Sequence, residues 1–354
     1  MLNTNDRLER IAHYRMAAEG AMQVLGYTFD ADNPTGPVKL QGKLLKPPDI
    51  AYRQMRVAFE KLGYTPYLAN LPGKPGQCEL TVVAGVTPKL PSNPMTNLWL
   101  FLATVASVIF AGGMSDTDFR WADGLMFAGS LMGILVAHEA GHYIVGRIRG
   151  APVSLPYFIP LPGISIGTMG AVIVQREPFE DRRRMIEIGI AGPLAGFMLA
   201  VPLYVAGLML SKVEVAPTTG GAFLGYSLLT YFLELLVVGR NDLMVSLHPI
   251  ASGAWIGLLI TGINLIPAGQ LDGGHAAAAL LGGNARYISW AMIAALLGLA
   301  FLSQMWLLWA LLLFLFGRSH PEPLNSVTPL EPQHYALGIV AVLVLILVFI
   351  PVPI

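Results

Sequence analysis

Two histidines and a glutamate lie close together inside an otherwise apolar stretch. Residues 138–142 read HEAGH, an HExxH motif within the segment GSLMGILVAHEAGHYIVGRI. Four residues are a little more than one helical turn, so a helix would place the imidazoles of His138 and His142 on one face. There they can bind one zinc ion, while Glu139 takes a proton from a zinc-bound water whose pKa the metal lowers to about 7.

The alternative is a buried polar cluster without a metal, because an HExxH string also arises by chance. The apolar surroundings favour the metal. Two histidines and a glutamate within a membrane helix cost several kcal/mol unless they are paired or metal-bound. We therefore predict one zinc ion (Zn2+) per chain at His138 and His142, with Glu139 as the catalytic base.

A second polar motif interrupts a later apolar stretch. Residues 264–275 read NLIPAGQLDGGH, and Pro267 and the glycines would break a helix there. Broken helices at membrane depth persist only where they line a site or a cavity. Asp272 offers the carboxylate that a catalytic zinc with two histidines needs as its third protein ligand. His275 is the competing ligand, or else a neighbour of the site or a surface group, and the alternative for the whole motif is a polar loop.

Small residues recur at spacings of three and four in residues 189–196, GIAGPLAG. Gly189, Gly192 and Gly196 let a helix approach its neighbour closely. We expect this segment to pack tightly, with the zinc-bearing helix as the candidate neighbour, and to carry no chemistry of its own.

The elements that carry these motifs belong to a strongly apolar chain. Of 354 residues, 54% are apolar and 12% are charged, about half the charged share of a soluble domain, and the mean hydropathy is +0.59. Lys and Arg (22) balance Asp and Glu (22), which excludes the basic surface of a nucleic-acid-binding protein. The single cysteine, Cys78, excludes an intrachain disulfide and a multi-cysteine zinc cluster. The composition predicts a protein embedded in a lipid bilayer.

The apolar stretches can be compared with the roughly 20 residues that a crossing helix needs. The stretch 287–316 is too long for one crossing, and Ser303 and Gln304 near its middle predict a hairpin of two short helices. The stretch 221–238 is long enough to cross but carries Glu234, which makes it ambiguous. The other candidates are 97–113, 124–146, 185–211, 246–266 and 334–352. The predicted fold class is a polytopic α-helical membrane protein with about seven transmembrane helices, or eight if 221–238 crosses.

Residues 1–95 hold much of the charge and predict a small soluble α+β domain. The first twenty residues suggest a polar helix and lack the apolar core of a secretory signal. Periodicity and turn residues predict a helix over 49–62 and strands over 38–45, 65–71 and 78–86. A linker rich in proline and asparagine (88–94) then leads to the transmembrane domain, 96–354.

Arginine gathers in one loop between apolar spans. The loop 147–184 holds six arginines, whereas 114–123 holds only Arg120 and 212–245 holds one lysine and one arginine. The positive-inside rule then puts the loop 147–184 and the N-terminal domain in the cytoplasm. His138 lies toward that end of its span, so water would reach the zinc from the cytoplasm. A full crossing by 221–238 would carry Asp272 to the opposite face. A three-ligand site therefore predicts that this stretch lies at the outer interface or re-enters.

The loop 151–175 contains FIPLPGISIGTMGAVIVQ, a β-branched run with Gly167 and Gly170. It could form a short hairpin dipping toward the site. A free edge there would pair with an unwound substrate segment and satisfy its backbone groups, as in strand addition. An amphipathic loop lying on the membrane is the equal alternative.

Taken together and in this order, HEAGH, GPLAG and N-x-x-P followed by DGGH resemble the site-2 protease family of intramembrane zinc metalloproteases. The resemblance is greatest to the bacterial and chloroplast branch without a PDZ domain, through LHPIASGAWIGLLITGINLIPAGQLDGGH (247–275). It covers about 97–340, and GYTPYL (63–68) fits the same branch.

This resemblance implies zinc ligands at His138, His142 and Asp272, with Glu139 as base and proton shuttle. It implies that Asn264 contacts the substrate or the oxyanion, and that the catalytic core of the metalloprotease domain spans about 124–285. The implied substrates are single-pass transmembrane proteins that another protease has usually trimmed first. The implied location is a bacterial inner membrane.

A different class of function is also compatible with intramembrane acidic residues and histidines, namely a non-catalytic transporter or a metal-binding scaffold. A transporter built on inverted repeats should show matching broken helices in its two halves. The sequence has no second copy of N-x-x-P followed by DGG.

Overall fold

The chain forms two compact units. The first comprises Met1–Leu90, Glu177–Met185 and Pro321–Glu331, and the second comprises Pro91–Arg176, Ile186–His320 and Pro332–Ile354. The first unit therefore includes two segments that lie, in sequence, far inside the predicted transmembrane domain. The computed structural model describes residues 4–28, 36–86, 93–115, 118–164, 166–214, 225–239, 244–316 and 322–353. Most of the predicted linker (88–94) lies outside these residues.

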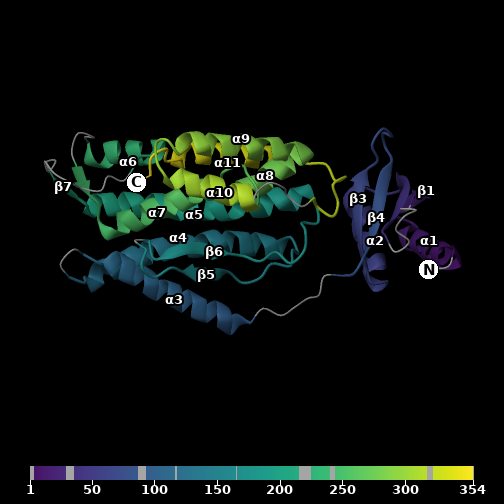
Figure 1. The fold of residues 1–354 in the computed structure, drawn as a ribbon, viewed down its shortest axis with the longest axis horizontal. Coiled ribbons are helices and arrows are strands. Elements are labelled where there is room, and N and C mark those ends of the chain that lie inside the picture. Colours follow the sequence, from purple (N-terminus) through teal and green to yellow (C-terminus); the bar gives the residue numbers. More distant parts are fainter. Residues whose placement is uncertain are drawn as a thin grey trace. The chain divides into compact units, whose positions relative to one another are not determined.

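The first unit is built on a four-stranded antiparallel sheet (Figure 1). The strand order is β1-β2-β4-β3. The core is made by alternate residues of the strands, such as Leu40, Leu68 and Leu80, packed with Tyr52 and Phe59 of α2. Its elements are α1 (Thr4–Ala18), β1 (Met22–Thr28), β2 (Val38–Leu44), α2 (Pro48–Lys61), β3 (Tyr64–Asn70) and β4 (Cys78–Ala84). The predicted helix and the three predicted strands are confirmed, whereas β1, an edge strand with mostly exposed or half-buried residues, was not predicted.

Two distant segments extend the sheet, one after the other, beyond the free edge of β3. The Leu68 N–H donates to the carbonyl of Leu324 (2.8 Å), and the Ser326 N–H donates to the carbonyl of Leu68 (2.9 Å). The segment 321–331 bonds in turn to 177–185, through the Asn325 N–H and the carbonyl of Glu180 (2.8 Å). Backbone pairing of this kind has no sequence motif, because every residue offers the same N–H and C=O.

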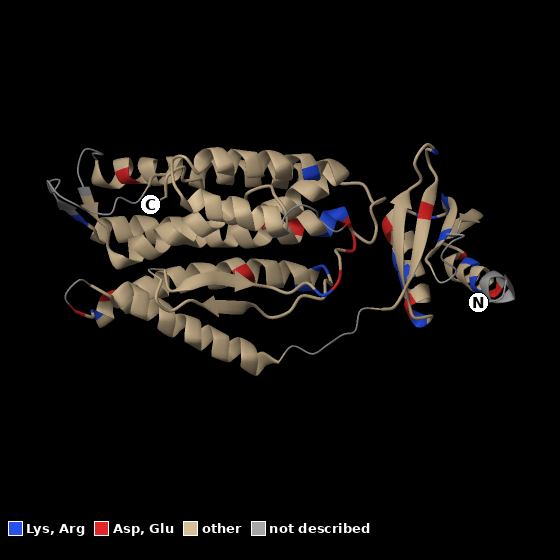
Figure 2. Cartoon of the chain, viewed as in Figure 1, with Lys and Arg blue, Asp and Glu red and all other residues tan. Residues whose placement is uncertain are grey.

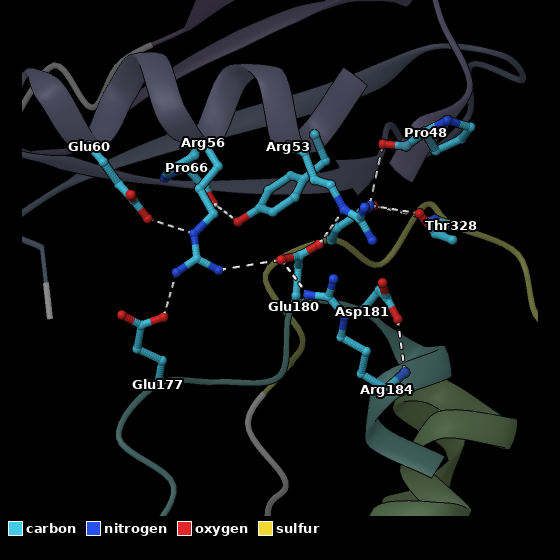
Figure 3. Close-up of polar contacts among 12 residues, drawn as sticks. Pro48, Arg53, Arg56, Glu60, Pro66, Glu177, Glu180, Asp181, Arg184 and Thr328 are labelled. Carbon is cyan, nitrogen blue, oxygen red and sulfur yellow. Dashed lines mark hydrogen bonds and ion pairs between the residues drawn. The ribbon is translucent and has the colours of Figure 1, made fainter. Parts of the chain in front are cut away.

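Arg56 of α2 forms ion pairs with the segment 177–185 (Figure 3). Its guanidinium lies 2.6 Å from Glu60, 2.6 Å from Glu177 and 3.5 Å from Glu180. Burial lowers the pKa of Arg56, but the hydrogen bonds and charges of Glu60 and Glu177 outweigh burial and raise it above its usual value. The first unit is therefore held by ion pairs between segments more than a hundred residues apart.

The second unit consists of apolar helices, and few charged residues lie along them (Figure 2). In the described part of the chain, three helices are long and apolar enough to span a membrane: α3 (Pro94–Gly113), α4 (Trp121–Ile148) and α5 (Arg182–Leu210). The shorter helices are α6 (Leu228–Val238), α7 (Pro249–Asn264), α8 (Asp272–Leu281), the 3-10 turn η1 (Gly282–Asn284), α9 (Ala285–Leu299), α10 (Met305–Phe316) and α11 (Pro332–Val348). The predicted apolar helices are confirmed to within a few residues, including the hairpin of α9 and α10, which breaks at Ser303. The number of crossings remains a prediction.

Two short paired strands place the start of α7 at the end of the bundle where α5 ends. After α5, β7 (Lys212–Glu214) pairs antiparallel with β8 (Met244–Ser246), directly before α7. The segment between them contains α6, whose 11 residues extend only about 17 Å against a hydrocarbon core of about 30 Å. The ambiguous stretch 221–238 thus contains a helix too short to cross alone. Its residues 221–224 lie outside the described part of the chain. As a result α7 runs in the same direction as α4 and packs beside it.

The loop after α4 contains the predicted hairpin. β5 (Tyr157–Pro160) pairs antiparallel with β6 (Thr168–Val172). Its turn lies against α3, where a Cβ on Gly167 would be 2.7 Å from the carbonyl oxygen of Ser107. The Asn97 side chain donates to the carbonyls of Leu155 and Pro156 at 3.2 and 2.8 Å and holds the entry to β5. The depth of the hairpin relative to a membrane remains a prediction.

The path through β7 and β8 predicts that Tyr226 and Leu236, both exposed, lie on one side of the membrane. We expect single cysteines there, in a Cys78→Ala background, to react with an impermeant maleimide only from the face opposite to a control cysteine at Arg147. Labelling of the two positions from opposite faces would contradict the topology.

Candidate metal centre

Helix α4 presents three polar side chains to the interior of the second unit. His138, Glu139 and His142 are 3%, 5% and 9% exposed. The one-turn spacing brings the two imidazole rings together, with centroids 5.0 Å apart. The helix itself follows from 28 largely apolar residues, so the polar groups are buried among apolar neighbours.

Asp272 completes a compact triangle of potential ligand atoms. Its Oδ2 lies 3.2 Å from Nε2 of His138 and 3.3 Å from Nε2 of His142. The two Nε2 atoms lie 3.2 Å from each other. Within the described residues, these three side chains form the group able to hold a metal ion.

The triangle fits a zinc ion. Tetrahedral bonds of about 2.0–2.1 Å separate the ligand atoms of zinc by about 3.3 Å, which matches all three sides. Two imidazoles and one carboxylate are also a usual ligand set of catalytic zinc, and three protein ligands leave the fourth position open to water or substrate. An isolated cluster of this kind, without a metal, would bury a carboxylate between two imidazoles at a high desolvation cost.

A backbone carbonyl orients one of the imidazoles. Nδ1 of His142 lies 2.7 Å from the carbonyl oxygen of Ile188 in α5. Since a carbonyl accepts, Nδ1 carries the proton and Nε2 keeps its lone pair, directed into the triangle. Such partners fix the tautomer and the ring orientation of metal-binding histidines.

The small residues of α5 make room for this arrangement. A Cβ on Gly192 would lie 2.1 Å from Nε2 of His142, and one on Gly196 would lie 3.3 Å from Nδ1 of His138. On the α4 side, a Cβ on Gly141 would lie 2.4 Å from the carbonyl oxygen of Ala191. The predicted tight packing of residues 189–196 is therefore confirmed: Gly192 and Gly196 lie against α4, which carries the HEAGH motif, and Gly189 lies against α8.

The broken segment between α7 and α8 positions Asp272. α7 ends at Asn264, and Asp272 opens α8, where the helix dipole favours a carboxylate. Gly269 has φ +57°, and its N–H donates to the Ser289 hydroxyl of α9 at 3.2 Å. A Cβ on Gly273 would lie 2.1 Å from the carbonyl oxygen of Leu265, so the loop closes only with glycine there.

The structure also places the remaining candidates. Nδ2 of Asn264 lies 3.4 Å from Nε2 of His138, beside the triangle. His275 lies one turn after Asp272 in α8 and faces Gly189 of α5. A Cβ added to Gly189 would lie 3.0 Å from the Cβ of His275. It is Asp272, and not His275, that meets the two histidines. Sequence reasoning missed the Ile188 carbonyl and Ser289, because neither a backbone oxygen nor a lone serine carries a motif.

Comparison with known proteins gives matches in the same region. The family model described as Peptidase family M50 matches residues 126–305, which hold all three motifs. The probable zinc metalloprotease EGY1, chloroplastic, of Arabidopsis thaliana is 33% identical over 238 residues, covering 64% of this chain and 43% of the relative. The probable zinc metalloprotease EGY2, chloroplastic, of the same plant is 34% identical over 227 residues, covering 62% and 40%.

A more distant relative is the probable zinc metalloprotease EGY3, chloroplastic, of Oryza sativa subsp. indica, 26% identical over 248 residues, which cover 64% of this chain and 42% of the relative. The chain thus spans about two fifths of the length of the curated relatives it matches. No solved structure matches the chain.

The close approach at Gly192 predicts that even one methyl group there disrupts the site. We expect Gly192→Ala to displace His142 and to lower the zinc content of the purified protein well below one per chain. Gly129→Ala on α4 is the matched control, because a Cβ there meets no atom within 4 Å. Full zinc content in the Gly192 variant, measured by atomic absorption, would show that the packing is not as described.

Proposed function

The chain belongs to peptidase family M50, the site-2 protease family, and from this premise we propose that it is an intramembrane zinc metalloprotease that hydrolyses peptide bonds of transmembrane helices. The observation that carries the proposal is the triangle of His138, His142 and Asp272, with Glu139 beside it, inside a bundle of apolar helices. The relatives are zinc metalloproteases by name, which supports zinc as the metal.

The roles of the side chains follow from their chemistry. Zinc held by the three ligands would act as a Lewis acid and lower the pKa of water to about 7. Glu139 would accept the proton of the attacking water on a carboxylate oxygen and pass it to the nitrogen of the leaving amide. Glu139 is buried, and this burial would limit competition from bulk water for the proton.

We propose that Asn264 contacts the substrate. Its Nδ2 is a donor and lies beside His138, on the side of the triangle formed by the α7–α8 connection. A donor at this position would bind the carbonyl oxygen of the scissile bond or the oxyanion that develops from it. We propose that Asn264 contributes binding and orientation, and that it is not a zinc ligand.

The substrates we propose are single-pass transmembrane proteins. A helix must unwind before a peptide bond within it can be attacked, and its freed backbone groups need partners. The hairpin of β5 and β6 offers such partners, because a strand edge can pair with an extended peptide. The arginines of the loop 147–184 favour a cytoplasmic position for this end of the bundle, with the N-terminal domain on the same side.

Replacement of the proposed base separates catalysis from metal binding. We expect Glu139→Gln to lower cleavage of a transmembrane test substrate by about 10²–10⁴-fold or more, because a general base is lost, while zinc content stays near one per chain. Cleavage of the substrate in proteoliposomes would be measured by gel electrophoresis, as the conversion of the substrate to shorter fragments. Full activity in this variant would end the protease proposal and leave a transporter or a metal-binding scaffold.

Replacement of the ligands tests the triangle itself. We expect His142→Ala and Asp272→Ala each to weaken zinc binding by more than the roughly 10–100-fold that loss of an outer partner costs. Zinc affinity would be measured by competition with a chromophoric chelator. Unchanged affinity in the Asp272 variant would transfer the role of third ligand to His275.

A further inference from the structure

Three helices of the second unit meet at one carboxylate, that of Glu187 in α5. Arg149, at the end of the zinc-bearing helix α4, donates from Nη2 to Oε1 at 2.6 Å, and its Nε lies 2.6 Å from Oε2. His334, in the first turn of α11, has Nε2 3.2 Å from Oε1. The Glu187 and His334 side chains are only 12% and 1% exposed. The proposed catalysis does not use this cluster.

The cluster lies on the same helix interface as the metal centre. Arg149 follows His142 by seven residues, about 20° short of two full turns, so both face α5. In α5, the residue after Glu187 is Ile188, whose carbonyl holds Nδ1 of His142. The contact between Arg149 and Glu187 and the contact between His142 and Ile188 are thus successive points along one line of approach between α4 and α5.

The rest of this interface has little to resist sliding. In α5 it is lined by Gly192 and Gly196, which have no side chains to interlock with α4. Displacement by one residue corresponds to about 1.5 Å along the axis, enough to break the 2.7 Å bond to His142. The hydrogen bond from Nη2 of Arg149 to Oε1 of Glu187 is charge-assisted and directional, and it therefore fixes the register that packing through glycines leaves free.

We propose that Glu187 is a positioning residue for the metal centre. By gripping Arg149 and His334 it locks α5 against α4 and α11, and it thereby holds the Ile188 carbonyl on Nδ1 of His142. The inference rests on the proposed zinc function, since it concerns the geometry with which His142 presents Nε2. A merely structural role would lower thermal stability without changing how the folded protein binds metal.

The test measures metal binding by the full chain in detergent, with no need for a substrate. Zinc affinity is measured by chelator competition, and Co2+ replaces zinc to report ligand geometry through its visible absorption. The variants are Glu187→Ala, Glu187→Gln and Arg149→Ala. Arg183→Ala is the matched control, because Arg183 lies one turn earlier in α5 and forms an ion pair with Glu331 (2.7 Å).

We expect Glu187→Ala and Arg149→Ala each to weaken zinc binding by about 10–100-fold, the usual effect of losing an outer partner, and to shift the Co2+ spectrum. Glu187→Gln keeps an acceptor oxygen for Arg149 and should recover much of the affinity. Arg183→Ala should bind zinc within about twofold of the unmodified chain, because it leaves the α4–α5 interface intact.

The decisive variant is Arg149→Ala, because the Arg149 side chain is 48% exposed and its removal is compatible with folding even if Glu187→Ala is not. Unchanged zinc affinity and an unchanged Co2+ spectrum in Arg149→Ala would overturn the inference, whatever its melting temperature. Failure of the unmodified chain to bind zinc would instead overturn the proposed function.

Discussion

The structure of the second unit depends on the burial of two imidazoles and two carboxylates among apolar helices. Each of these groups would be costly there without a partner. The side chains of His138, His142 and Asp272 provide partners for one another by converging, at separations of 3.2–3.3 Å that suit a divalent ion. Glu139, the residue after His138, is buried with them.

Convergence at this scale requires the helices to come unusually close. Glycines on both α4 and α5 allow it, and at Gly192 the imidazole of His142 takes the space that a Cβ would fill. Close approach through small residues leaves an interface with little side-chain interlocking, so directional polar contacts gain importance. Those contacts are the Ile188 carbonyl on His142 and, two turns further along α4, the pair formed by Arg149 and Glu187.

Much of the secondary structure was predictable, because it is written in local periodicity and length. The long apolar stretches became helices, the break at Ser303 divided α9 from α10, and the hairpin in the loop after α4 formed. The short strands β7 and β8 were missed, since three residues carry no periodicity. The sequence also did not show that segments 177–185 and 321–331 belong to the first unit. They are bound there by ion pairs of Arg56 and by backbone hydrogen bonds of Leu68, contacts between residues far apart in the chain.

For the candidate metal centre, several features could be predicted from the order of the residues alone: the types of the candidate ligands, the one-turn spacing of His138 and His142, the glycines that permit close packing and the broken segment that carries Asp272. The folded chain was needed to show that Asp272, and not His275, lies against the two histidines. It was also needed to show that the Ile188 carbonyl contacts His142 and that Ser289 accepts from the Gly269 N–H. The reason is physical. Spacing within one helix follows from its pitch, whereas the meeting of atoms from α4, α5 and α8 depends on helix register, which is set by contacts among residues far apart in the chain.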